Sequence, residues 1–191
     1  MTATDICNKS LTLLGADSIS DLTEGSKRGD LCRIHYDHER TSLIQSGYYA
    51  FAVKPWVLSS QVYPPPDVDY DYALRLPDEA LSLLRVNSNV KWQQSGRIVL
   101  TNNPILEVDL TWDVEDTTEF SPMFEDALIL SLAKALCIPI TENQNLYAQL
   151  DQQAREACIR GKGADTAYRH RADRRMSTIR MSRWNAGRGR R

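Results

Sequence analysis

The sequence has few of the residues that build metal or nucleophilic centres. Its 191 residues include only three histidines and four cysteines. The cysteines are far apart and fall on segments with helical periodicity, which indicates neither a CxxC metal pair nor a dense disulfide framework. We therefore expect free thiols in a reducing compartment. They are Cys7, Cys32, Cys137 and Cys158.

Long apolar runs are absent as well. The longest, ALILSLAKALCIPI, is interrupted by Lys134 and Pro139. The N-terminal stretch MTATDICNKS lacks the basic and apolar regions of a signal peptide. We expect neither secretion by signal peptide nor a membrane span.

Sequence signatures of common ligand sites are missing or incomplete. No GxxxxGK[ST] or GxGxxG phosphate loop occurs. Asp67, Asp69 and Asp71 have the spacing of a calcium loop, but Tyr72 stands where that loop needs glycine and Asp78 where it needs glutamate. A solvated acidic strand face explains these residues more simply.

Two histidines offer the other metal pattern. His35 and His38 lie three residues apart and can present two nitrogens from one helix, but no third ligand accompanies them. We interpret them as surface or subunit-contact residues and expect no metal and no cofactor. None of the serines or cysteines has a readable histidine partner, so we predict no catalytic residue.

The sequence does show a strong division of charge. Residues 162–191 hold ten Lys or Arg against two acids, a net +8, which leaves −10 for residues 1–161 because the whole chain sums to −2. A near-neutral total therefore hides an acidic body joined to a basic arm. This polarity indicates assembly onto a partner rather than turnover of a small molecule.

Hydrophobic periodicity divides the chain into four parts. Residues 1–47 and 120–161 have helical spacing, whereas residues 48–119 alternate with period two and carry prolines that exclude long helices. We predict an α+β fold, mainly α: a split helical bundle (1–47 and 120–161), an inserted small antiparallel β module (48–119) and an extended basic C-terminal arm (162–191).

The first half of the bundle is predicted to hold two helices. Thr4 or Asp5 can cap the first, and Gly15 is suited to end it. Ser26 can start the second, which ends near Gly47. Two packing stripes are predicted on the second helix: Cys32, Tyr36, Glu39 and Leu43, and beside them Leu31, Ile34 and His38.

The β module is predicted to be one small sheet of hairpins. In Asp67–Leu76 and in Leu106–Asp113, apolar residues alternate with aspartate and glutamate, so each strand has an apolar and an acidic face. After it, Ser121 and Pro122 begin a helix that Pro139 stops, and Thr141 with Gln144 forms a capping box for a last helix.

The basic arm mixes cations with apolar residues of the types that anchor protein interfaces. A solubility tail and a phosphate-neutralising tail are the alternatives. We predict that it binds a partner or neighbouring subunit. The residues are Tyr168, Arg169, Arg171, Arg174, Arg175, Met176, Ile179, Arg180, Met181, Arg183 and Trp184.

Three stretches together resemble the head-to-tail adaptor family of tailed bacteriophages, which includes the tail tubular protein A of short-tailed phages. They are ICNKSLTLLGADSISDLTEGSKRGDLCRIHYDHERTSLIQSGYYAFA, YALRLPDEALSLLRV and FSPMFEDALILSLAKALCIPIT. The likeness covers roughly the first 160 residues in the family's order, and its weight lies in the combination. Tyr49 departs from it, since tryptophan is expected before the Ala-Phe pair.

The resemblance implies a structural virion protein without enzymatic activity. Such adaptors form a ring, usually a dodecamer, that docks beneath the portal protein and supplies the platform for the tail or nozzle. Genomic DNA would pass without sequence-specific contacts and no membrane would be involved. The protein would be made in the host cytoplasm and reside in the tail or neck of the virion.

A DNA channel should be neutral or lined with negative charge, because phosphates that bind its wall would stall. Asp67, Asp69 and Asp71 are our candidates for channel-lining residues. Two other functions stay open at this point. One is a peptidoglycan-degrading hydrolase with a carboxylate pair that the sequence does not identify, and the other is nucleic-acid binding through the arm.

Overall fold

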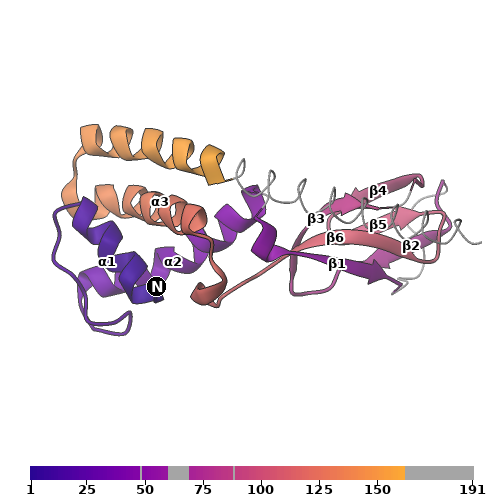
Figure 1. Cartoon of the computed structure of the whole chain (residues 1–191), viewed down its shortest axis with the longest axis horizontal. Helices are drawn as coiled ribbons and strands as arrows, with labels where there is room; N and C mark the ends of the chain where they lie inside the picture. The colour runs from indigo at the N-terminus through magenta and orange to yellow at the C-terminus, as the bar shows by residue number, and fades with distance from the viewer. Residues whose placement is uncertain (48, 60–68, 88, 162–191) are drawn as a thin grey trace, which may run out of the picture.

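A computed structural model of the chain describes residues 1–47, 49–59, 69–87 and 89–161. Within them the fold is α+β, as predicted, with four α-helices and two antiparallel sheets of three strands each. The helices form one end of an elongated molecule, the helical body, and the strands form the other end, the β module (Figure 1). Residues 47, 49–52 and 113–121 connect the two, and we call them the junction.

The elements follow in an order that splits the helical body around the β module. Their bounds are α1 Ala3–Leu13, α2 Lys27–Ser46, the 3-10 helix η1 Ala50–Ala52, β1 Val53–Leu58, β2 Tyr72–Arg75, β3 Ala80–Val86, β4 Trp92–Ser95, β5 Ile98–Thr101, β6 Leu106–Trp112, the 3-10 helix η2 Thr117–Glu119, and α3 Pro122–Thr141. A last helix covers residues 144–161.

Helix α1 begins two or three residues earlier than its sequence predicts. Thr2, and not Thr4 or Asp5, is its N-cap: the Thr2 hydroxyl accepts from the Asp5 amide, and the Asp5 carboxylate accepts from the Thr2 amide at 2.8 Å. Asp5 is therefore the second half of a capping box. Gly15, with φ of 67°, ends the helix as predicted, because the left-handed conformation suits glycine.

Helix α2 begins after the predicted cap, Ser26, and ends before Gly47. The first predicted stripe is buried at Cys32, Tyr36 and Leu43, while Glu39 is half-buried. The second stripe is wrong, because Ile34 and His38 are exposed and Leu31 is only half-buried. The residue that completes the buried stripe is Arg40, which has α-helical spacing from Tyr36.

Helix α3 starts at the predicted Ser121 cap and Pro122, but Pro139 does not stop it. The helix continues to Thr141 and ends where Glu142 adopts a left-handed conformation. Pro139 lies in the last turn of the helix. Its missing N–H therefore removes one hydrogen bond near the helix end and does not interrupt the rest of the helix. The last helix is capped by Asn143, whose side chain accepts from the Leu146 amide, so the predicted Thr141–Gln144 capping box is wrong.

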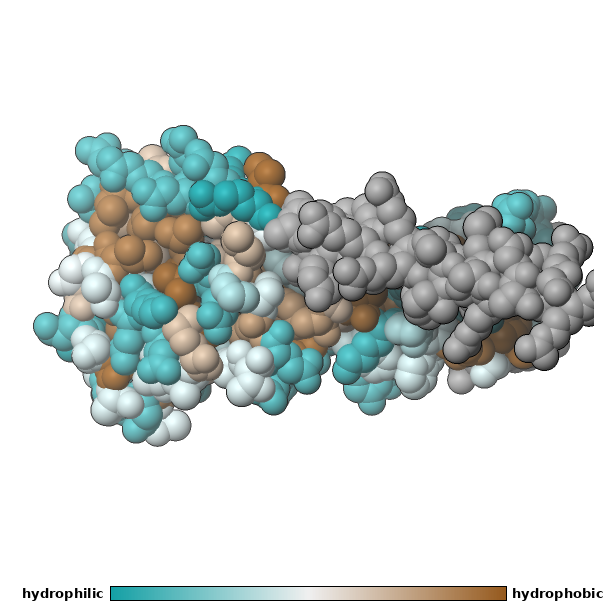
Figure 2. Space-filling view, in the orientation of Figure 1, coloured by the Kyte–Doolittle hydropathy of each residue, from teal (hydrophilic) through white to brown (hydrophobic). Residues whose placement is uncertain are grey.

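The last helix packs on α3 and runs back toward the junction (Figure 1). Leu150, Ala154 and Ala157 face the interior, and Asp151 forms an ion pair of 3.7 Å with Lys134 of α3. Its outer face is hydrophilic (Figure 2). Among the described residues, no helix combines the length and apolarity that a bilayer crossing requires.

An aromatic cluster closes the helical body at the junction. Tyr49 is fully buried and meets Phe124 edge-on at 4.8 Å between ring centroids, and Phe51 and Phe120 complete the cluster. A methyl group on Gly47 would overlap the Tyr49 ring, and one on Gly161 would lie 3.2 Å from it. The position of the tyrosine ring therefore depends on glycine at position 47, whereas a methyl group at position 161 would make a tight contact with it.

The β module consists of two sheets, which corrects the single sheet predicted. One has the order β1-β6-β3 and the other β2-β5-β4. Their apolar faces meet in one core that includes Leu58, Val108 and Leu110 from the first sheet and Leu74 and Val99 from the second. The molecule thus has a second core apart from that of the helical body.

Candidate interaction surfaces

The register of the strands defines which end of the β module is far from the helical body. Ala80 of β3 pairs with Trp112 of β6, next to the junction, so the opposite ends of these strands point away from it. We call this far end the tip. Its described segments are residues 69–71, 89–91 and 102–105.

Two of the three predicted channel-lining residues lie at the tip. Asp69 and Asp71 are exposed on both sides of buried Tyr70, and Asn102 accepts a hydrogen bond of 3.2 Å from the Asp71 amide. The Lys91 ammonium lies 4.9 Å from the centroid of the Tyr70 ring. A cation therefore shares this acidic surface. Asp67 lies outside the described residues.

All the predicted partner-binding residues of the arm, from Tyr168 to Trp184, also lie outside the described part of the chain. The structure does place the residue from which the arm departs. Gly161 is buried against Tyr49 and the backbone of Met123, in the first turn of α3. The arm therefore starts at the junction, midway along the molecule, rather than at either end.

The junction also carries exposed acidic residues. Glu115, Asp116 and Glu119 are exposed on the segment between β6 and α3. Asp116 caps η2, and the hydrogen bonds from the Thr118 amide and hydroxyl lower the pKa of its carboxyl. The junction therefore presents these three acidic residues to solvent on the segment between β6 and α3.

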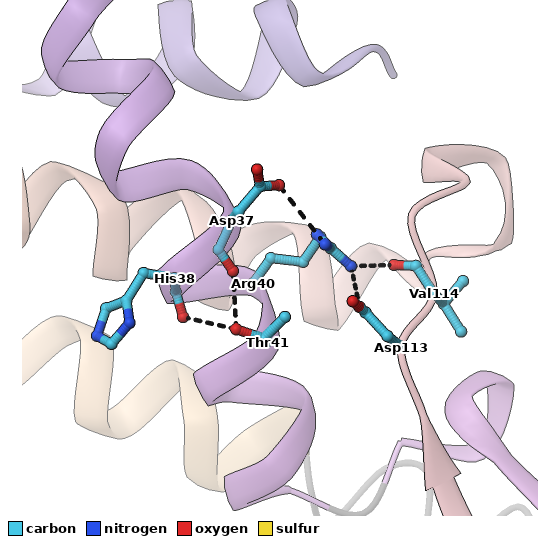
Figure 3. Close-up of polar contacts among 6 residues, drawn as sticks. All are labelled: Asp37, His38, Arg40, Thr41, Asp113 and Val114. Atoms are coloured by element: carbon cyan, nitrogen blue, oxygen red, sulfur yellow. Dashed lines mark hydrogen bonds and ion pairs between the residues drawn. The ribbon is translucent and has the colours of Figure 1, made fainter. Parts of the chain in front are cut away.

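A buried polar group of α2, Arg40, binds the junction, and sequence reasoning did not identify it. Figure 3 shows its guanidinium reaching from α2 to the segment that leaves β6. Nη1 donates to the Asp113 carboxylate and, at 2.7 Å, to the Val114 carbonyl, while Nη2 lies 3.5 Å from Asp37 on its own helix. The Arg40 side chain is 4% exposed, whereas Asp113 is 31% exposed.

A signal for Arg40 was present in the sequence. Cys32, Tyr36 and Arg40 are spaced by four and share one helical face, and a charged residue on a buried stripe needs a partner. The stripe was assigned to Glu39 instead, one position away. The identity of the partner, Asp113, depends on tertiary contact and has no local signal.

The acidic faces predicted for the strands are not uniformly solvated. Glu107 is exposed, but Asp109 of β6 is buried, with its carboxylate 3.0 Å from Arg85 and 3.0 Å from the Asn87 amide of the neighbouring strand segment. Alternation alone does not distinguish such a residue from a solvated one. Asp109 is thus a structural group rather than surface charge.

The cysteines are free thiols, as predicted, with Cys7, Cys32 and Cys137 buried and Cys158 half-buried. A hydrogen bond with Cys32, together with burial, raises the pKa of Cys7 well above its ordinary range. A protonated, buried thiol is a poor nucleophile. Among the described residues, no three His, Cys, Asp or Glu side chains gather to hold a metal ion.

Two hollows of the described surface bear on the hydrolase alternative. One, of about 270 Å³, lies between β1 and the β2–β3 connection and has Asp78 as its one carboxylate. The other, of about 350 Å³, lies between the start of α2 and the end of α3 and has none. A glycosidase needs two carboxylates across one cleft. Neither hollow supplies them.

Comparison with known proteins adds no assignment: no family model matches the chain, and no curated protein matches it significantly.

Proposed function

We propose that this protein is a structural subunit of a phage virion, a head-to-tail adaptor that forms a ring beneath the portal. It performs no chemical turnover. The ring, a dodecamer in this proposal, continues the DNA channel and carries the tail or nozzle. The proposal rests first on the three resembling stretches of sequence described above.

The observation that carries most weight is the division of the chain into a helical body and a β module, each with its own core. The two halves of the helical body flank the β module in the sequence. The first half falls in the first resembling stretch, and the second half begins in the third. A helical body with its own core can pack beside copies of itself, while the β module projects to form a rim. An elongated subunit of this kind suits a ring with an extended lumen (Figure 1).

Surface chemistry also supports assembly. Several large apolar side chains of the helical body are exposed, including Ile34 on α2, Met123 on α3 and Ile159 on the last helix. Figure 2 shows apolar surface on the helical body beside the hydrophilic ridge of the last helix. Contiguous apolar surface is typical of faces that become buried in assemblies.

The arm supplies the second contact in this proposal. Its ten cations steer it toward an acidic partner surface, and Met176, Ile179, Met181 and Trp184 are the anchors that decide affinity. We propose that it leaves the junction to bind the portal or a neighbouring subunit. Because Gly161 belongs to the packed core around Tyr49, removing residues 162–191 should leave the body folded.

Truncation after Gly161 tests the proposal. Full-length and truncated proteins are incubated with portal-bearing heads, and ring occupancy is measured by electron microscopy. We expect rings on the portal with the full chain and none with the truncated chain, while a cooperative thermal unfolding transition shows that the truncated chain is folded. Full occupancy by the truncated protein would contradict the role of the arm, and absence of any ring from the full chain would contradict the adaptor role.

Two control assays separate the alternatives. Release of soluble fragments from purified peptidoglycan by the full chain would favour the hydrolase. Salt-sensitive binding of duplex DNA by the free full-length protein, lost on truncation, would favour the nucleic-acid reading.

A further inference from the structure

The buried Arg40 guanidinium of α2 binds two consecutive residues of the junction, Asp113 and Val114, and we call this contact the latch. We infer that Arg40, through Asp113 and Val114, fixes the angle between the helical body and the β module, and that the two parts pivot when this contact is lost. The inference concerns the isolated chain and does not depend on the adaptor proposal.

The position of the contact supports this role. Trp112 is the last residue of β6, the central strand of its sheet, and Val114 is already buried in the core of the helical body. Only Asp113 lies between them. On this connection a single residue therefore separates the two cores, and Arg40 binds both Asp113 and Val114.

The burial of the Arg40 guanidinium limits the geometries that this contact can adopt. A guanidinium that is 4% exposed must keep its hydrogen bonds, because a buried charge without partners is strongly unfavourable. Arg40 Nη1 donates both to the Val114 carbonyl, which belongs to the core of the helical body, and to the Asp113 carboxylate next to β6. A rotation of the β module that displaces Asp113 therefore strains at least one of the two bonds. Few orientations satisfy Arg40.

Within the described residues, Leu81 of β3 and Gln45 of α2 also connect the two parts. Leu81 is half-buried against the core of the helical body, and such apolar contacts are non-directional. Gln45, in the last turn of α2, donates to the Leu81 carbonyl of β3 at 3.1 Å, but it is an exposed neutral contact. Exposed hydrogen bonds of this kind exchange readily with water. The Arg40 contact is buried, and we assign the orientation to it.

Distance measurement between spin labels tests the latch. Gln93 on β4 and Gln153 on the last helix are exposed and are replaced by cysteine for labelling. The background carries Cys158→Ser, since the other three native cysteines are buried. Double electron–electron resonance then reports the distribution of distances between the helical body and the β module.

We expect one narrow distribution for the wild-type background and a broadened, shifted one for Arg40→Met, which keeps an apolar stem and removes the charge. Asp113→Ala should broaden it too. The variant with both substitutions should give the same distribution as Arg40→Met alone, because Arg40→Met already removes the contact with Asp113. The control is Asp30→Asn, which removes an exposed ion pair with Arg33 on the same helix and should change nothing.

Circular dichroism establishes that each variant is folded. An unchanged, narrow distribution in folded Arg40→Met overturns the inference. If Arg40→Met does not fold, Asp113→Ala decides, because Arg40 then keeps the Val114 carbonyl: an unchanged distribution in that variant equally overturns it.

Discussion

Arg85 of β3 and Asp109 of β6 stand opposite each other in the sheet and form an ion pair of 3.0 Å in which only the carboxylate is buried. The arginine is 57% exposed and the aspartate 3%. The pair is therefore asymmetric. Water can solvate the Arg85 guanidinium if the pair breaks, whereas the Asp109 carboxylate lies in the protein interior and depends on its protein partners.

This asymmetry predicts the cost of losing the arginine. Arg85→Ala should lower the free energy of unfolding by about 1–3 kcal/mol, because a buried carboxylate loses a charged partner. Arg75→Ala is the control, since Arg75 pairs with exposed Asp78 and such pairs contribute about 0–1 kcal/mol. Urea denaturation of both variants measures the difference, and equal losses would refute this account.

Tyr36 should make the protein sensitive to alkali. Burial raises the pKa of its hydroxyl to about 12, above the ordinary value near 10, so stability is complete below pH 10 and falls as the pH rises through 12. Its oxygen is buried and makes no hydrogen bond within the described residues. Tyr36→Phe should therefore be near neutral at pH 7.

The measurement is the free energy of unfolding at pH 7, 10 and 11.5. Between pH 7 and 11.5 the free energy of unfolding of the wild type should fall by up to about 2 kcal/mol because of Tyr36. The Tyr36→Phe variant should not show this part of the loss. Tyr147→Phe, at a 40% exposed tyrosine, is the control and should follow the wild type. An identical alkaline loss in Tyr36→Phe would show that other groups cause it.

Gly47 should be intolerant of a single methyl group. Its φ of −118° suits any residue, so the effect of Gly47→Ala is steric: the new Cβ overlaps the buried ring of Tyr49. We expect a loss of about 1–3 kcal/mol. Gly25→Ala, where nothing lies within 4 Å of the added carbon, should change stability little. Thermal unfolding of the two variants makes the comparison, and similar melting temperatures would contradict it.

Charge at the tip should matter for the passage of DNA if the adaptor proposal holds. Asp69→Lys with Asp71→Lys should slow genome ejection, because phosphates are then retained by the wall. The control reverses Asp17 and Glu156, two exposed acids of the helical body, by the same amount. Ejection is followed by dye uptake into released DNA. Equal rates for both double variants would remove the tip from the channel.

Local signals in the sequence predicted local structure well. Ser26, Gly47, Ser121 and Gly15 mark helix ends as expected, because capping depends on residues within a few positions. Errors arose where several residues competed for one role: Asn143 caps the last helix although Thr141 stands nearby. Pro139 lies so close to the end of α3 that the hydrogen bond lost at its position does not end the helix there.

Long-range features were not predictable in the same way. The division of the strands into two sheets depends on register and pairing, which alternation does not specify. Arg40 and Asp109 look like surface charges in a linear pattern, yet each is buried through a partner far along the chain or on another strand. Of the predicted channel-lining residues, Asp69 and Asp71 are exposed at the tip, and whether they face DNA stays a prediction.

The burial of Gly161 against Tyr49 fixes an origin for the arm. Thirty residues follow it. A fully extended chain of that length spans at most about 100 Å. Under the adaptor proposal, every surface that the cations of residues 162–191 contact must lie within about 100 Å of Gly161. Both ends of the same molecule and the flanks of adjacent copies would then compete for one arm.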